Sequence, residues 1–223
     1  MFLLIDKPKG VTSHDVVDVI RGITGEKRVG HAGTLDPNAT GLLIVGVGRD
    51  STRKLGDLTK KTNKKYVADI FLGEERDTDD IEGQIVKKVI PTTTPDINVI
   101  RKTLDIFLGK QLQTPPAFSA IKVGGKKAYK EARKGKEIVL EPREIVVYSI
   151  NLINYEYPHL TLKFSVSAGT YIRSLARDIG KHLGVGGYLF DLRRTRVGDF
   201  NVKDAVNLAS LNKDNWKTYA ILI

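Results

Sequence analysis

Two hydrophobic periodicities alternate along this chain, and together they predict interspersed strands and helices. Short apolar runs at residues 2–5 and 42–45 are typical of buried strands. Residues 66–72 and 160–167 place apolar side chains at every second position, which predicts strands with one buried face. Residues 145–153 predict another strand, close enough in sequence to the one that follows for the two to form a hairpin.

Three further segments have the spacing of amphipathic helices. Ser13 is a candidate cap for the first helix. The second spans residues 95–108, with Thr94 as its cap. The third runs from Gly169 to near Gly184. This order of elements predicts an α/β fold of the α+β type, in which helices pack on a mixed, largely antiparallel sheet.

Residues 111–141 lack a sustained hydrophobic period and are rich in glycine, proline and lysine. We therefore expect a long loop with a short helical turn, and a loop of this length inside a compact domain is usually functional. The chain of 223 residues is long enough for one substantial domain, with or without a lobe. We find no internal repeat and no linker, so the sequence predicts a single domain over residues 1–223.

The charge of the chain indicates a polyanionic partner. Lysine and arginine number 36 against 26 acidic residues, for a net charge of +10. Between residues 122 and 136 there are seven basic residues and one acid, Glu131. The basic residues there are Lys122, Lys126, Lys127, Lys130, Arg133, Lys134 and Lys136. Two smaller clusters are Lys60, Lys61, Lys64 and Lys65, and Arg193, Arg194 and Arg196. Because a solvated helix face normally mixes signs, three nearly unmixed clusters favour contact with phosphates.

Several classes of function are excluded by composition and spacing. The chain has no cysteine, which excludes disulfides, thiol catalysis and zinc–thiolate sites, and its four scattered histidines lack metal-ligand spacing. Residues 77–83 begin like a calcium loop, but Ile81 occupies a ligand position. No dinucleotide or phosphate-loop signature is present. No apolar run approaches the ~20 residues of a membrane span, so we expect a soluble, cytoplasmic protein.

Asp36 stands out because its surroundings constrain the backbone. Residues 30–41 include three glycines and one proline and lead directly into the apolar run 42–45. Glycine permits conformations closed to other residues and proline fixes φ, so this loop has a defined shape. Loops of this kind commonly display catalytic groups. The same carboxylate would equally suit a tight turn in which it only caps backbone amides.

Residues 30–41 resemble the signature of the TruB family of pseudouridine synthases, the tRNA pseudouridine(55) synthases. Other segments resemble further blocks of this family in the same order, namely residues 7–13, 64–66, 77–83, 115–129, 169–175 and 192–194. Ordered blocks are far more specific than any single motif. The resemblance implies the pseudouridine synthase fold, a thumb-like basic RNA-binding loop at residues 111–141, and isomerisation of uridine 55 in the T-loop of tRNA.

The resemblance also implies a chemistry. Uracil is detached from ribose C1′ at N1 and reattached through C5 without redox change, so we expect neither a cofactor nor a metal. One ionised carboxylate beside the sugar is required, as nucleophile or as base. The resemblance assigns Asp36 to that role, Arg173 to keeping it charged, and Tyr66 to stacking on the displaced uracil and to proton transfer through its hydroxyl. Arg173 falls in the first turn of a predicted helix, where the helix dipole disfavours a cation, and this misfit supports a functional role.

Further residues take their roles from the resemblance alone. His31 would fill the gap left by the extruded base, and Tyr171 and Leu192 would line the pocket. The sequence by itself allows His31 as a surface residue, Leu192 as a core leucine and Tyr66 as a core aromatic. Four lysines in the thumb-like loop are the candidates for contact with the RNA backbone: Lys126, Lys127, Lys130 and Lys134.

Other functions fit parts of this pattern. A non-catalytic RNA-binding or RNA-chaperone protein would use the basic loop equally well, but it would not need Asp36, Tyr66 and Arg173 together. A glycoside hydrolase would need two carboxylates across a sugar. The order of the blocks favours the tRNA type over the related guide-RNA-dependent type. Family members commonly carry a further C-terminal RNA-binding domain, and we expect none here. We therefore expect a monomer that acts on the T-arm stem-loop of tRNA.

Overall fold

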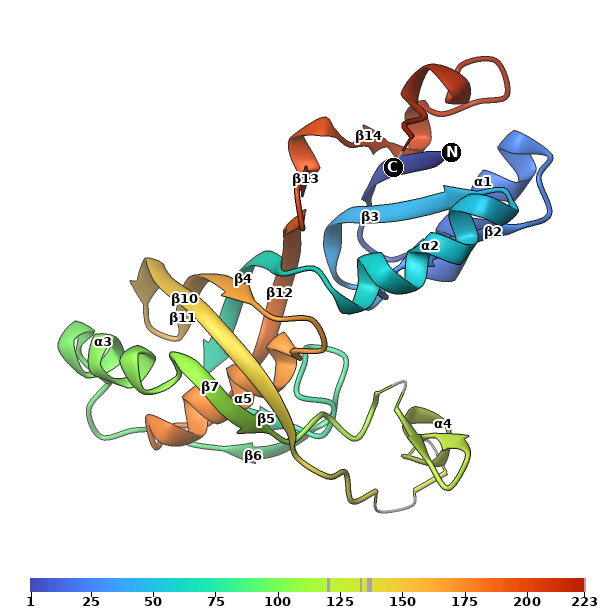
Figure 1. Cartoon of the computed structure of the whole chain (residues 1–223). Helices are drawn as coiled ribbons and strands as arrows, with labels where there is room; N and C mark the ends of the chain where they lie inside the picture. The colour runs from blue at the N-terminus through green and yellow to red at the C-terminus, as the bar shows by residue number, and fades with distance from the viewer. Residues whose placement is uncertain (120, 133, 136–137, 223) are drawn as a thin grey trace. The chain divides into compact units, whose positions relative to one another are not determined.

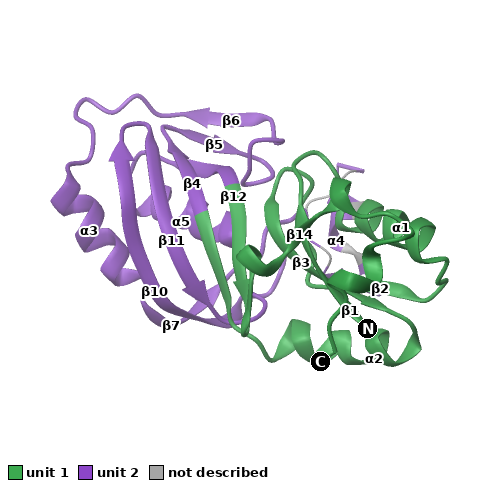
Figure 2. Cartoon of the chain, turned by 90° about the horizontal axis from the view of Figure 1, so that it is seen from above, with its two compact units in different colours: residues 1–67, 192–223 green, residues 68–191 purple. Residues whose placement is uncertain are grey.

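The computed structural model describes residues 1–119, 121–132, 134–135 and 138–222 (Figure 1). The chain divides into two compact units (Figure 2). Unit 1 comprises Met1–Val67 and Leu192–Ile223, and unit 2 comprises Ala68–Asp191. The strand β4 (Lys64–Leu72) leads from unit 1 into unit 2, and β12 (Gly187–Val197) leads back. Action of residues 1–223 as a single catalytic domain stays a prediction.

Unit 1 is built on a mixed sheet with the strand order β14-β1-β3-β12, in which β2 also pairs with β3 and β13 with β12. The further strands are β1 (Phe2–Lys7), β2 (Val29–Ala32), β3 (Thr40–Val47), β13 (Phe200–Asn201) and β14 (Val206–Asn207). The strands β1 and β3 are antiparallel, whereas β12 runs parallel to β3, with Arg193 opposite Thr40. The sheet therefore places the end of β12 beside the start of β3.

The helices α1 (Ser13–Thr24) and α2 (Arg49–Lys60) pack on this sheet through alternate residues of the same strands. Leu43 and Val45 of β3 belong to the core cluster that contains the apolar side of α1. Leu42 and Ile44 belong to a second cluster, with Leu55 of α2. Because both faces of β3 are covered, its sequence is a continuous apolar run. Short 3-10 helices follow at Val202–Asp204, Leu208–Ser210 and Trp216–Tyr219.

Unit 2 contains the strand order β4-β11-β10-β7, with β10 antiparallel to both of its neighbours. The strands of unit 2 that have not yet been given bounds are β5 (Glu74–Arg76), β6 (Ile85–Lys88), β7 (Gly109–Gln113), β8 (Lys122–Val123), β9 (Lys126–Lys127), β10 (Arg143–Glu156) and β11 (His159–Val166). The pairs β5–β6 and β8–β9 form separate two-stranded sheets. The helices are α3 (Ile97–Ile106), α4 (Ala128–Ala132) and α5 (Ile172–His182). The helix α3 contacts β10 and α5 and buries Ile100 and Leu104.

All five predicted strands are present, and the mixed, largely antiparallel sheet with packed helices is confirmed. The two predicted caps are wrong. Thr12, not Ser13, caps α1, with its hydroxyl accepting from Asp15 N at 3.0 Å. Asp96, not Thr94, caps α3, because its carboxylate reaches the amides of the first helical turn, and the helix starts at Ile97.

The sequence missed β12. Its run of arginines interrupts the apolar pattern of the strand. Within residues 111–141 the structure has the end of β7, the small hairpin β8–β9 and α4, the expected helical turn. This segment is called the thumb loop below.

Candidate active site

Asp36 lies in the connection between β2 and β3 in unit 1, and main-chain contacts define the shape of this connection. Ala39 N donates to Asp36 O at 3.0 Å, which closes a tight turn. Ser13 of α1 binds both main-chain atoms of Leu35: its hydroxyl donates to Leu35 O at 3.0 Å and accepts from Leu35 N at 2.9 Å. The side chain that was expected to cap the helix thus holds the residue next to Asp36. The connection, residues 33–39, is called the Asp36 loop below.

Two buried cations bind the same loop. Lys7, at the end of β1, is 0% exposed, and its ammonium donates to Pro8 O at 3.0 Å, Val11 O at 2.6 Å and Pro37 O at 3.1 Å. Three carbonyls therefore match the three N–H donors of the protonated amine. The carbonyl of Pro37 belongs to the residue that follows Asp36, so Lys7 fixes the backbone beside the carboxylate.

Arg194 of β12 binds the start of the Asp36 loop and the strand β3 that follows it. It is 1% exposed, and it donates from Nη2 to Gly33 O at 2.9 Å and from Nε to Leu42 O at 2.8 Å. A Cβ at Gly41, whose φ is +100°, would collide with the main-chain oxygen of Arg194. Only glycine therefore permits β3 to approach β12 this closely.

The surroundings of the Asp36 loop are positively charged. Burial lowers the pKa of Lys7 to about 8, against the opposing effect of the Asp36 charge, and the charge of Arg194 lowers it further. The negative charge of Asp36 acts on the pKa of Lys7 in the opposite direction to burial, so the two side chains interact electrostatically.

His31, Tyr66 and Leu192 all lie in unit 1 with Asp36. His31 is part of β2, opposite Val45, and its Nδ1 is buried without a hydrogen-bond partner among the residues that the structure describes. Burial lowers the pKa of His31, and the charges of Arg194 and His14 act in the same direction, so the ring is neutral near pH 7. Tyr66 and Leu192 are buried on β4 and β12, in keeping with pocket or core positions.

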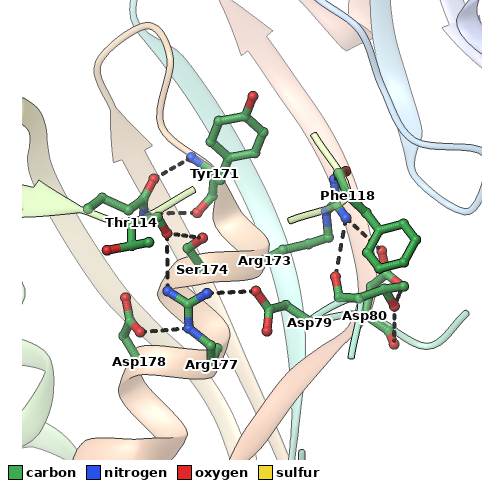
Figure 3. Close-up of polar contacts among 11 residues, drawn as sticks. Asp79, Asp80, Thr114, Phe118, Tyr171, Arg173, Ser174, Arg177 and Asp178 are labelled. Carbon is green, nitrogen blue, oxygen red and sulfur yellow. Dashed lines mark hydrogen bonds and ion pairs between the residues drawn. The ribbon is translucent and has the colours of Figure 1, made fainter. Parts of the chain in front are cut away.

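Arg173 is the second residue of α5, in unit 2, and it is 6% exposed. Its guanidinium joins two segments. Nη1 donates to Thr78 O at 3.2 Å and lies 3.3 Å from Asp80 Oδ2, while Nη2 donates to Phe118 O at 3.0 Å (Figure 3). Arg173 thus connects residues 77–83, called the acidic loop, to residues 114–119, called the thumb root.

Two aspartates of the acidic loop pair with arginines of α5. Asp80 pairs with Arg173, and Asp79 Oδ2 lies 2.8 Å from Arg177 Nη1. The loop is ordered from within, because Thr78 Oγ1 donates to Asp80 Oδ1 at 2.6 Å. Among the described residues no group of three or more acidic or histidine side chains is placed to hold a metal ion.

Tyr171 directly precedes α5, and a buried glutamine fixes its main chain. Gln113, at the end of β7, donates from Nε2 to Tyr171 O at 3.0 Å and accepts at Oε1 from Tyr171 N at 2.8 Å. This pair of bonds replaces a side-chain cap and sets the start of the helix that carries Arg173.

Two of the three basic clusters differ from expectation. Arg194 is buried as described, and Arg193 makes a two-pronged pair with Asp6, at 2.7 and 3.0 Å. Lys64 is also buried, with its ammonium on Thr59 O and Thr62 O at 2.5 and 2.7 Å. The prediction that these clusters contact phosphate is therefore wrong for Arg194 and Lys64, because both side chains are buried and bind main-chain carbonyls inside the protein.

The thumb loop keeps its exposed lysines. Lys126 is exposed, and the Lys134 side chain is 62% exposed while pairing with Glu131 at 3.0 Å. The side chains of Lys127 and Lys130, together with Arg133 and Lys136, lie outside what the structure describes. Contact of the four predicted lysines with RNA stays a prediction.

Sequence reasoning missed four residues that build these sites: Lys7, Arg194, Asp79 and Arg177. One signal for Lys7 was available, since it lies two residues after the buried Ile5 and therefore on the same face of β1. Asp36 and Arg173 belong to different units, and their partnership stays a prediction. No helix of the described chain has the length and apolar character required to span a bilayer.

Comparison with solved structures places the fold in a known class. In "Crystal Structure of a Cbf5-Nop10-Gar1 Complex", a chain 32% identical to this one gives a TM-score of 0.74, over 99% of this chain and 56% of that one. In "Structure of H/ACA RNP bound to a substrate RNA containing 2'-deoxyuridine", the TM-score is 0.69 at 30% identity, over 99% and 56% of the two chains. The chain thus spans just over half the length of these structural relatives. This arrangement is the pseudouridine synthase fold.

Sequence comparisons identify the family. The model for the TruB family pseudouridylate synthase N-terminal domain matches residues 21–172, and that for the tRNA pseudouridylate synthase B C-terminal domain matches residues 173–220. A tRNA pseudouridine synthase B from Leifsonia xyli is 46% identical over 94% of this chain and 70% of its own length. One from Desulfotalea psychrophila is 46% identical over 91% and 84%. The chain belongs to the TruB family of pseudouridylate synthases, and it is an isomerase.

Proposed function

We propose that this enzyme isomerises the uridine at position 55, in the T-loop of tRNA, with Asp36 as the reacting carboxylate. The observation that carries the proposal is the Asp36 loop itself. Lys7, Arg194 and Ser13 all bind its main chain, so the position of Asp36 is fixed by its backbone. A carboxylate held in this way suits a reaction that requires one fixed anion beside a sugar.

The proposed reaction is balanced without an external reagent. The bond between N1 of uracil and C1′ of ribose breaks, and a bond between C5 and C1′ forms. C5 loses one proton and N1 gains one, so the number of protons in the substrate does not change. Asp36 serves either by attacking C1′ or by assisting elimination to a glycal, and both routes require its ionised form.

The other candidate residues take supporting roles in this proposal. Arg173 stabilises the charge of Asp36 when RNA is bound, and Tyr66 stacks on the displaced uracil. His31 fills the space left by the extruded base, which is reasonable because extrusion costs a few kcal/mol of stacking. Leu192 and Tyr171 line the pocket. The exposed lysines of the thumb loop contact the RNA backbone.

The substrate proposal draws on the relatives, which are named as enzymes of tRNA. The T-arm is proposed because the ordered motifs resemble the type that acts at position 55. A stem-loop of ~17 nucleotides is enough to present that loop on one short stem, and loops whose bases can be splayed out are the usual targets of specific RNA recognition.

The direct test is conversion of an unmodified T-arm stem-loop by the purified protein and by its Asp36→Asn variant. We expect pseudouridine at position 55 with the wild type and none with the variant, while RNA affinity stays within a few-fold because no positive charge is removed. Measurable product from the variant would remove Asp36 from its proposed role. RNA binding by the wild type without product would instead indicate a non-catalytic RNA-binding protein.

A further inference from the structure

Arg177 lies one helical turn after Arg173 on α5 and repeats its pattern of contacts. Arg173 joins the acidic loop to the thumb root. Arg177 does the same with different partners: Nη1 lies 2.8 Å from Asp79 Oδ2, and Nη2 donates to Thr114 O at 3.1 Å (Figure 3). Two arginines on one side of a helix therefore each bind the same two segments.

Asp79 is held in an uncommon conformation that directs its carboxylate to Arg177. Its φ is +61°, and it is the one non-glycine residue with positive φ among the residues that the structure describes. Its main chain is bound to β12, because Leu189 N donates to Asp79 O at 3.0 Å and Ile81 N donates to Leu189 O at 3.1 Å. A left-handed residue costs energy and persists where its surroundings hold it.

We propose that Arg177 and Asp79 form a positioning pair for the isomerisation. The pair fixes the acidic loop and the thumb root on α5, so that Arg173 meets Thr78, Asp80 and Phe118 together. This inference rests on the proposed function in one respect, since it takes Arg173 to act beside the reacting uridine. Arg177 and Asp79 themselves act through Arg173 and do not touch the RNA.

The same arginine supplies a matched control. Asp178 Oδ1 accepts from Arg177 Nε at 2.9 Å, but Asp178 belongs to α5 itself, and within the described part of the chain it makes no hydrogen bond or ion pair to another segment. Replacing Asp178 removes one carboxylate from Arg177 without releasing the acidic loop. Replacing Asp79 also removes one carboxylate, and it does release the loop.

The experiment compares Asp79→Asn, Arg177→Gln and Asp178→Asn by single-turnover conversion of the T-arm stem-loop at saturating enzyme and by RNA affinity. Displaced active-site groups typically cost one to two orders of magnitude, so we expect the rate to fall about tenfold or more in the first two variants. Their Kd should stay within about threefold, and Asp178→Asn should stay within about twofold of the wild type in both measurements. Asparagine tolerates positive φ, so Asp79→Asn carries the test if Arg177→Gln does not fold.

The dependence of the conversion rate on pH provides a second test, because it reports on the charge of Asp79. Burial raises the pKa of Asp79 to about 6, opposed by the charges of Arg177 and Arg173 and reinforced by that of Asp178. Above pH 6 the wild-type carboxylate is ionised, and below it the carboxylate becomes neutral like the asparagine. The ratio of wild-type to Asp79→Asn rates should therefore be about tenfold at pH 7.5 and approach one at pH 5. A ratio near one at pH 7.5, where the wild-type carboxylate is ionised, would overturn the inference.

Amide hydrogen exchange separates this inference from the proposed function. Loss of the pair should accelerate exchange at Ile81 N and Leu189 N, which bind the acidic loop to β12. If the wild type forms no pseudouridine at all, the proposed function fails, and the exchange rates still decide whether the pair fixes the loop. The positioning role would be overturned by any of three results in the variants. These are unchanged amide exchange, faster exchange with an unchanged conversion rate, and weaker RNA binding with an unchanged conversion rate.

Discussion

Lys7 and Arg194, two cations with almost no solvent exposure, bind main-chain carbonyls of the same loop: Lys7 holds Pro37 O at 3.1 Å and Arg194 holds Gly33 O at 2.9 Å. Asp36 lies between these two attachment points in the sequence. The protein thus fixes its candidate catalytic carboxylate through the backbone on either side.

Lys7→Met should lower both stability and rate. Methionine matches the length of the lysine stem, but it leaves three carbonyls in the interior without donors, and each unsatisfied buried group costs about 1–3 kcal/mol. We expect a clear fall in the urea midpoint and a larger fall in kcat than in RNA affinity. Lys7→Arg is the control for charge, because its planar fork cannot meet three converging carbonyls. Wild-type kcat in Lys7→Met would show that the Asp36 loop does not depend on this contact.

Arg173→Lys should cause a large loss of activity although the charge is retained. The guanidinium divides its donors between the acidic loop and Phe118 O, whereas a lysine ammonium is a compact point charge. We expect kcat to fall by at least about tenfold with little change in RNA affinity. The measurement is single-turnover conversion at saturating enzyme, and near-normal conversion would rule out Arg173 as the cation that acts on Asp36.

A quadruple glutamine variant of the thumb loop should bind RNA more weakly and with a smaller dependence on salt. The four residues replaced are Lys126, Lys127, Lys130 and Lys134. If about six charges of this loop meet phosphates, log affinity should fall with log salt at a slope of roughly −4 to −5 in the wild type. The quadruple variant should lose a large part of that slope while its rate at saturating RNA is unchanged. An identical slope in both proteins would contradict contact between the thumb loop and RNA.

Lys64 gives a prediction for stability against pH. Burial lowers the pKa of Lys64 to about 8, and the charge of Arg194 acts in the same direction. Between pH 8 and the ordinary lysine pKa near 10.5, the unfolded chain binds more protons than the folded one, so stability contributed by this residue rises with pH. Relative to Lys64→Met, the wild type should therefore gain unfolding free energy from pH 8 to 10.5. Parallel urea titrations at several pH values measure this difference, and parallel curves would contradict it.

The regular parts of the fold were predictable because their residues follow simple periods. The helical spacing of Val16, Val17 and Ile20 indicates α1, and the alternation of apolar residues from Tyr66 onward indicates β4. The strand β12 was not predictable in this way, because the charged residues Arg193 and Arg194 break its apolar pattern. Their guanidinium groups form hydrogen bonds with other parts of the protein. Their carbonyl and carboxylate partners lie far away in sequence, and no local pattern reveals such distant contacts.

The candidate site was predictable only in part for a similar reason. Asp36, Tyr66 and Arg173 were predicted from ordered motifs, and the structure defines the surroundings of each within its own unit. The pairing of Asp79 with Arg177 joins residues nearly a hundred positions apart. Only the folded arrangement of the acidic loop on α5 brings them together. Positioning residues of this kind carry no signature of their own in a single sequence.

The burial of Lys7, Lys64 and Arg194 divides the basic residues of this protein into two populations that respond differently to ionic strength. Charges on the outside are screened beyond a Debye length of about 10 Å at 0.1 M salt, whereas charges inside the protein are screened far less. Concentrated salt should therefore detach RNA from the exposed lysines while Lys7 and Arg194 keep their hydrogen bonds to the Asp36 loop. A high-salt wash during purification should yield RNA-free protein that regains full activity once the salt is diluted.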